Sequence, residues 1–204
     1  MRRIVFITFL LLAAMWPLAA AGGGFRPVYG LEYGLTATIS EWHHTNYRSP
    51  EGPRVNQIHT DFEQTPLGYF GMWAGLEYAR HWSTAMVLSI NGISRERTVS
   101  SLSLRMAYFL KSYDQDGVKL FLEGGAGVTE TFKGLVDVLG KAGASYRFVL
   151  ADRMTLEMQL AFQMSLDHPA TVIDRYSGNI LTQNSILRSD AVYTGINIGL
   201  ALSF

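Results

Sequence analysis

Hydrophobic and polar residues alternate along the last stretch of the chain, from Ala191 to Phe204. From Val192 onward every second residue is apolar or threonine, and most of the residues between them are small or polar. A period of two residues places successive side chains on opposite faces of an extended backbone. The pattern therefore predicts a β-strand that runs to Phe204.

The same alternation recurs upstream and predicts eight strands. They cover residues 29–40, 67–79, 82–91, 98–111, 118–130, 139–150, 154–165 and 191–204. Each strand is near or above the roughly 9–11 residues with which a tilted strand crosses a lipid bilayer. The predicted fold class is all-β, an eight-stranded antiparallel up-and-down transmembrane β-barrel.

The predicted connections alternate between tight turns and longer loops. The turns are Arg80-His81, 112–117 and 151–153, and the longer loops are 41–66, 92–97, 131–138 and 166–190. Short turns at one end and longer loops at the other are typical of bacterial membrane barrels. Aromatic residues on the apolar face, among them Tyr29 and Trp82, fall near the turn-side strand ends, as an interfacial girdle would.

The two faces of the predicted strands differ in charge. One face is apolar and uncharged, whereas the other is rich in Gly, Ser and Ala and carries eight charged residues, with Lys111 at the rim. The eight are Glu32, Glu77, Arg105, Lys119, Glu123, Lys141, Arg147 and Glu157. An eight-stranded barrel has interior room only for side chains, and buried charges must be paired. We therefore predict a structural network that fills the lumen; the alternative is a gate in which pairs exchange to open a narrow pore.

The N-terminus has Arg2 and Arg3, an apolar run over 4–18 and the small residues 19–21. This pattern predicts a secretory signal peptide over 1–21 and leaves 22–204 as the barrel domain. The chain has no Cys, which excludes a disulfide scaffold or an acylated lipoprotein. With 17 basic and 17 acidic residues, the charge gives no support to nucleic-acid binding. No later apolar run approaches the ~18 residues of a membrane helix, so only a closed barrel could span lipid.

Together these features resemble the small eight-stranded bacterial outer-membrane proteins, such as the OmpA transmembrane domain and OmpX. The resemblance rests on the Phe204 ending, on the alternation and on residues 121–127, which read FLEGGAG. It implies a monomer in the outer membrane of a diderm bacterium, with Phe204 as a signal for the barrel-assembly machinery. It also implies a salt-bridged lumen and a non-enzymatic role without a cofactor, either membrane-structural or in surface recognition.

Loops 41–66 and 166–190 are the expected seat of any recognition, because long loops on a rigid scaffold usually carry function. Both contain aromatic and arginine side chains, which suit protein interfaces or the phosphates of lipopolysaccharide. These residues are Trp42, Tyr47, Arg48, Arg54 and Phe62 in the first loop, and Ile173, Arg175, Tyr176, Asn179, Ile180 and Arg188 in the last.

Two other functions are alternatives to a non-enzymatic membrane barrel. Residues 121–127 are also similar to a strand of the lipid A deacylases, which place a His-x-Ser pair on a later strand. Here the nearest match is Gln163-Met164-Ser165, and Gln cannot accept the Ser proton, while Asp167 and His168 are out of register. A soluble lipocalin-like calyx carrying an apolar ligand would reverse the faces, but its exterior would hold more charge and less Gly.

Histidines cluster in the same two loops, at His43, His44, His59 and His168. Four imidazoles near one rim could bind zinc or copper. However, His43 and His44 would point to opposite sides of a continued strand, and no carboxylate or Cys is apparent at a ligand spacing. The sequence therefore favours solvated histidines and no metal site.

Overall fold

The computed structural model describes residues 25–50, 52–62, 65–94, 97–128, 136–151, 154–174, 176–181 and 184–204. The predicted signal peptide lies outside these residues. Within them every regular element is a strand, and no helix is present that could cross a membrane.

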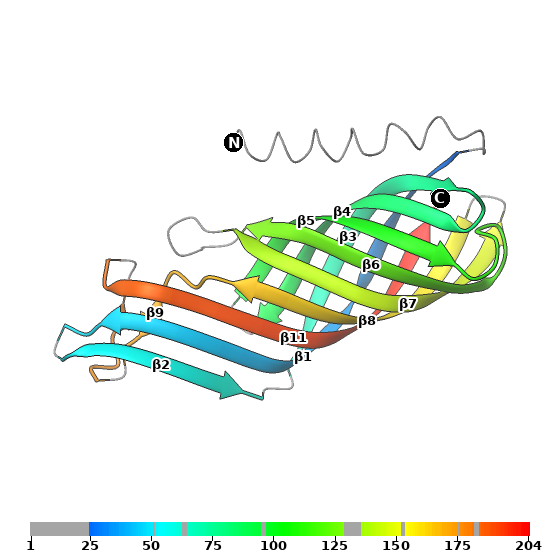
Figure 1. Cartoon of the computed structure of the whole chain (residues 1–204). Helices are drawn as coiled ribbons and strands as arrows, with labels where there is room; N and C mark the ends of the chain where they lie inside the picture. The colour runs from blue at the N-terminus through cyan, green and yellow to red at the C-terminus, as the bar shows by residue number, and fades with distance from the viewer. Residues whose placement is uncertain are drawn as a thin grey trace.

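Eight antiparallel strands close into a barrel, which confirms the predicted architecture (Figure 1). Each barrel strand pairs with the next one along the chain, and the last pairs with the first to close the sheet. The strands are β1 (Arg26–Arg48), β3 (Thr65–Tyr78), β4 (Trp82–Ser94), β5 (Arg97–Phe109), β6 (Gly117–Val128), β7 (Asp137–Ala151), β8 (Met154–Asp167) and β11 (Ile186–Ser203).

The barrel has two unlike ends. The C-terminus and the β3–β4, β5–β6 and β7–β8 connections lie at one of them, the turn end (Figure 1). At the opposite end, the extended end, β1 and β11 run on beyond the barrel. The β3–β4 turn covers residues 79–81, one residue more than predicted, and Ala79 and Arg80 have positive φ angles of 50° and 63°.

The extended end differs from the prediction of a loop over 41–66. There β1 continues to Arg48, and β2 (Arg54–Asp61) folds back along it as an antiparallel hairpin. On the other side of β1, β11 begins at Ile186, five residues before its predicted start. Residues 41–48, 54–61 and 186–193 thus form a three-stranded extension, here called the flap (Figure 1). Most flap residues are polar, so its strands lack the alternation of apolar and polar residues from which the barrel strands were predicted.

A β-bulge separates the flap from the barrel. The pairing of β1 with β11 shifts between Thr38 and Ser40, which adds one residue to β1. An extra residue reverses which alternate side chains face a given side. Thr36 is buried in the lumen below the bulge, whereas above it Glu41 is level with the inward-facing Tyr193. The lumen face of the barrel therefore continues into the odd-numbered residues of the flap.

Three other connections were predicted with partly wrong bounds. The predicted loop 92–97 is short, because β4 reaches Ser94 and β5 begins at Arg97. Most of the predicted loop 131–138 lies outside the described residues, and β7 begins at Asp137. Within 166–190, β8 extends to Asp167, and a small hairpin of β9 (Val172–Ile173) and β10 (Ile180–Leu181) follows.

The β8–β11 connection packs on the inner face of the flap. Leu181 joins Tyr47 and Ile186 in an apolar cluster, with Val55 and Val172 against it. Nearby, the Ser49 hydroxyl donates a hydrogen bond of 2.8 Å to Asp174. These contacts fix the connection above the barrel mouth.

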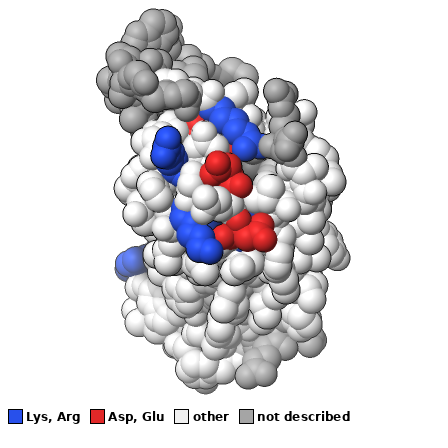
Figure 2. Space-filling model, turned by 90° about the vertical axis from the view of Figure 1, so that its right-hand side faces the viewer, with Lys and Arg blue, Asp and Glu red and all other residues white. Residues whose placement is uncertain are grey.

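The barrel wall is apolar outside and charged inside. Large apolar side chains such as Leu122, Leu160 and Ile198 are exposed on the exterior. In the barrel wall below the flap, every charged residue away from the strand ends is one of the eight predicted lumen residues, and all eight are buried. This is the reverse of a lipocalin-like calyx. Figure 2, which views the turn end, shows acidic and basic groups gathered mostly in one region amid uncharged surface.

Candidate functional site: a closed lumen and a rim pocket

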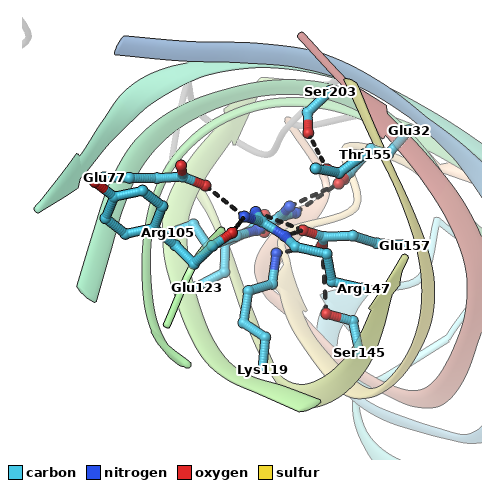
Figure 3. A network of polar contacts seen from close by, with 11 residues as sticks. Glu32, Glu77, Arg105, Lys119, Glu123, Ser145, Arg147, Thr155, Glu157 and Ser203 are labelled. Atoms are coloured by element: carbon cyan, nitrogen blue, oxygen red, sulfur yellow. Dashed lines mark hydrogen bonds and ion pairs between the residues drawn. The ribbon is translucent and has the colours of Figure 1, made fainter. Parts of the chain in front are cut away.

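The lumen layer nearest the turn end is centred on Arg147. Its guanidinium donates hydrogen bonds to Glu157 at 2.9 Å, to Glu77 at 2.7 Å and to the backbone carbonyl of Tyr113 at 2.9 Å. Lys119 donates to the second oxygen of Glu157 (Figure 3). Two carboxylates and two cations from four different strands are thereby joined across the lumen.

The next layer is centred on Arg105. Its two terminal nitrogens donate to both oxygens of Glu32, at 2.7 and 2.9 Å, and its Nε donates to Glu123 at 2.8 Å (Figure 3). Bidentate pairing between arginine and a carboxylate is the strongest class of protein ion pair. Since β1, β5 and β6 supply these residues, the layer connects the closing strand to the opposite wall.

Lys141 lies further toward the extended end and has a different environment. Its ammonium donates to the Asn91 side chain at 3.0 Å and lies 4.6 Å from the centre of the Tyr69 ring. Asn91 in turn donates to Ser89 at 2.7 Å. Asn91 is thus a lumen residue that the sequence analysis did not single out, although its inward position follows from the alternation.

Little space remains between the two arginine layers. The cavity there has a volume of about 10 Å³ and is lined by Trp73 and Glu77, among others. A cavity of that size holds about one water molecule at most. Toward the extended end, Ile93, Val99, Ala191 and Tyr193 form an apolar layer. The side chains therefore leave almost no space between the two arginine layers.

A further ion pair marks the extended rim. Arg97 donates to Asp167 at 2.8 Å, and the Asp167 side chain is fully buried. Both residues fall just outside the predicted strands, because sequence patterns place strand ends with an error of a few residues. Sequence analysis therefore left them in loops and missed the pair.

A pocket of about 720 Å³ opens above this rim, between the flap and the β8–β11 connection. Glu41, His43 and His59 of the flap contribute to its wall, with Arg97 and Tyr193 at its barrel side. Polar and apolar groups share its lining. Mixed lining of this kind suits a ligand with polar groups.

The four candidate histidines are divided among different surroundings. His43 and His59 are directly opposite each other on β1 and β2 and face the pocket. His44 is on the outer face, with its Nε2 3.0 Å from the side-chain amide oxygen of Asn56. His168 contacts Asp190 at 3.0 Å. As the side chains stand, no three His, Cys, Asp or Glu residues of the described chain surround a common point.

The outer face of the flap gathers three arginines. Arg48 of β1 and Arg54 of β2 are direct cross-strand partners. Arg188 of β11 is opposite Asn46, one row away on the same face. All three side chains are exposed, whereas Arg175, which the sequence analysis named in the last loop, lies outside the described residues. Like charges placed directly opposite destabilise a strand pair, so an anion over this face would stabilise it.

The candidate hydrolase residue Ser165 faces the barrel interior and is 2% exposed. Its cross-strand neighbours are Tyr193 and Leu139, and Gln163 precedes it on the same face. A lipid around the barrel would have no access to this hydroxyl. The geometry therefore gives no support to a lipid-cleaving role for Ser165.

Phe204 lies on the outer face of the turn end. Its backbone N–H donates to the Tyr29 carbonyl at 2.8 Å, and the two rings stack with centroids 6.0 Å apart. At the same end of the barrel, the rings of Trp82 on β4 and Tyr108 on β5 pack edge to face, with centroids 5.0 Å apart. Aromatic residues thus encircle part of the exterior at the turn end.

Asp174 anchors the β8–β11 connection electrostatically. Burial acts to raise the pKa of its carboxyl group, but hydrogen bonds from Ser177 and Ser49 outweigh burial and hold the pKa below its ordinary value. The carboxylate is therefore charged at neutral pH and keeps both partners in place.

Comparison with known proteins adds little beyond the barrel itself. No protein-family model and no curated protein sequence matches the chain. A Pseudomonas aeruginosa FadL homologue is similar in structure, with 12% identity and a TM-score of 0.35 over 89% of this chain and 52% of that one. The secretin InvG of the Salmonella SPI-1 type III secretion injectisome, in its open gate state, has 7% identity and a TM-score of 0.26 over 100% of this chain and 64% of that one. The chain thus spans about half to two thirds of these proteins, and similarities this low say nothing about what it does.

Proposed function

We propose that this protein is an integral outer-membrane β-barrel with a closed lumen, and that its working surface is the extended end. Its role is non-enzymatic, namely recognition at the cell surface. The observation that carries the proposal is the division of the barrel wall below the flap: every charge away from the strand ends is buried inside, and large apolar side chains cover the outside.

This division is costly for a protein surrounded by water. Soluble monomers rarely expose a contiguous apolar patch larger than a few hundred Å², whereas large apolar side chains are exposed here on all eight barrel strands. In lipid the same apolar exterior is favourable, and closure of the barrel pairs each of its eight strands on both edges. The aromatic pairs at the turn end suit the level of the lipid headgroups.

A bilayer recording tests the closed lumen. Purified protein refolded in detergent is reconstituted into a planar lipid bilayer, with detergent and lipid alone as the control. We expect no steady single-channel steps, because the two arginine layers fill the lumen. Steady conductance would contradict the plug and favour the alternative of a gated pore.

For the extended end, lipopolysaccharide is the proposed contact. Arg48, Arg54 and Arg188 share the outer face of the flap, and arginine binds phosphate groups in a bidentate manner. Phosphates around the sugar core would also relieve the repulsion between Arg48 and Arg54.

This contact is testable with lipopolysaccharide in detergent solution. Replacing the three arginines by alanine should weaken binding at least about tenfold, if each contact contributes on the order of 0.5–1 kcal/mol. Arg80→Ala, at the turn end, is the matched control and should bind as the wild type does. Equal binding of dephosphorylated lipopolysaccharide would refute the phosphate contact without affecting the barrel proposal.

Two further expectations belong to this proposal. Phe204, stacked on Tyr29, would be read by the barrel-assembly machinery before insertion. The finished barrel would be monomeric, since its strands leave no barrel edge unpaired. Loss of Phe204 should therefore slow insertion in cells while leaving refolding in detergent unchanged.

A further inference from the structure

The geometry points to a divalent transition-metal site on the inner face of the flap, built on His43 and His59. This site goes beyond the proposed function, since it uses neither the lumen network nor the outer arginines. The ion would be of the zinc or copper class, and its open coordination positions would face the rim pocket.

Cross-strand register is the first support. His43 and His59 are directly opposite each other in the β1–β2 hairpin, and Glu41 is likewise opposite Asp61. Opposite residues on one face of an antiparallel pair have Cβ atoms about 4.5–5.5 Å apart. At that separation two imidazoles can converge on one ion, because zinc–nitrogen bonds are about 2.0–2.1 Å long.

The carboxylates give the second support. The Nε2 atom of His59 is 2.8 Å from Asp61, and the Nε2 atom of His43 is 3.5 Å from Glu41. A histidine that binds a metal through one ring nitrogen characteristically donates its other N–H to a carboxylate, which orients the ring. Asp61 thus already orients the His59 ring, and Glu41 lies close enough to His43 to do so after a small movement. In both rings Nδ1 is the nitrogen that would bind the ion.

Access is the third support. The side chains of His43 and His59 are 27% and 58% exposed, and both line the rim pocket of about 720 Å³. With two protein ligands, the remaining positions of a tetrahedral ion are left for water or for a polar ligand in that pocket.

The bulge in β1 determines which face of the flap carries His43. Without the extra residue between Thr38 and Ser40, the odd-numbered residues of the flap would lie on the outer face. With it, His43 faces the barrel mouth and His44 faces outward, where it contacts Asn56. The two adjacent histidines therefore provide a test residue and its matched control on the same hairpin.

Zinc chloride is titrated into untagged, refolded protein in detergent, and heat is measured by calorimetry. We expect one zinc ion per chain with a dissociation constant well below millimolar. His43→Ala and His59→Ala should each weaken binding at least about tenfold, and Asp61→Asn about tenfold through the ring it orients. His44→Ala and His168→Ala should leave the affinity unchanged.

The copper form provides a second measurement. Electron paramagnetic resonance of the protein with one equivalent of Cu²⁺ should show hyperfine coupling to two nitrogen nuclei, and to one in His59→Ala. No binding below millimolar zinc, or an equal loss in His44→Ala, would overturn the site. Heat-shifted gel migration verifies that each variant is folded, and the bilayer result above is independent of this outcome.

Discussion

The barrel lumen and the flap both carry acidic and basic side chains in pairs, but the pairs differ in what surrounds them. In the lumen, Glu157 is buried between Arg147 and Lys119, and almost no space remains beside them. On the flap, the His59–Asp61 pair is about half exposed beside a large pocket. Buried pairs without space hold a structure together, whereas accessible pairs beside a pocket can exchange their partners for a ligand. Function is therefore to be sought at the extended end.

Removing one lumen charge should lower the free energy of unfolding more than any of the substitutions below. Glu157→Gln leaves Arg147 and Lys119 without their shared carboxylate, and breaking a buried pair in this way costs about 3–5 kcal/mol. The free energy of unfolding in urea, measured in lipid vesicles, should fall by that amount. Asp61→Asn on the flap removes an exposed pair and should cost less than about 1 kcal/mol. Similar losses in both variants would mean that the two regions do not differ.

A mutation within the flap should destabilise the flap without unfolding the barrel. Tyr47 is fully buried against Leu181 and Ile186, so Tyr47→Ala opens a cavity costing about 3 kcal/mol or more. Because this cluster lies outside the barrel, we expect faster protease cleavage in residues 168–185 and an unchanged heat-shifted barrel band. Loss of the barrel band would show that the regions fold as one unit.

The close contact between Gly199 and the Tyr69 side chain inside the barrel should give a smaller effect on stability. A methyl group at Gly199 would overlap the Tyr69 hydroxyl, whereas one at Gly124 would meet no atom within 4 Å. Gly199→Ala should therefore destabilise the barrel by about 1–3 kcal/mol, and Gly124→Ala should not. Tyr69→Phe removes the overlapping oxygen, so the double variant should lose less than the sum of the two single changes. Strict additivity in urea unfolding would contradict the contact.

The smallest expected effect contrasts two connections. Ala79 in the β3–β4 turn has φ of 50°, a conformation that costs an L-residue about 1–2 kcal/mol, part of which Ala79→Gly recovers. We expect a gain below about 1 kcal/mol in barrel stability after the greater entropy of unfolded Gly is subtracted. Gly178 has φ of 69° at the extended end, and Gly178→Ala should instead loosen the β8–β11 connection without altering barrel unfolding. Hydrogen exchange distinguishes the two responses.

The alternation in the sequence was sufficient to predict the barrel because one physical difference, apolar side chains outside and packed polar groups inside, repeats along every barrel strand. Glu32 and Arg147, for example, have their inward positions directly from that period. The flap was missed for two reasons. The bulge between Thr38 and Ser40 reverses the period, and both faces of residues 41–48 are polar, so no alternation marks the strand. The opposition of His43 and His59 depends on hairpin register, which only the paired backbone reveals.

Surface labelling of single-cysteine variants tests the proposed placement of the two ends. The chain has no Cys, so each introduced thiol reports one position. Ile58→Cys lies on the outer face of the flap, where the native side chain is 62% exposed, and Lys111→Cys lies at the turn end. On intact bacterial cells, a membrane-impermeant maleimide should label Ile58→Cys at once and Lys111→Cys only after the outer membrane is permeabilised. Labelling of both thiols on intact cells, or of Lys111→Cys alone, would contradict a barrel in the outer membrane with its flap at the cell surface.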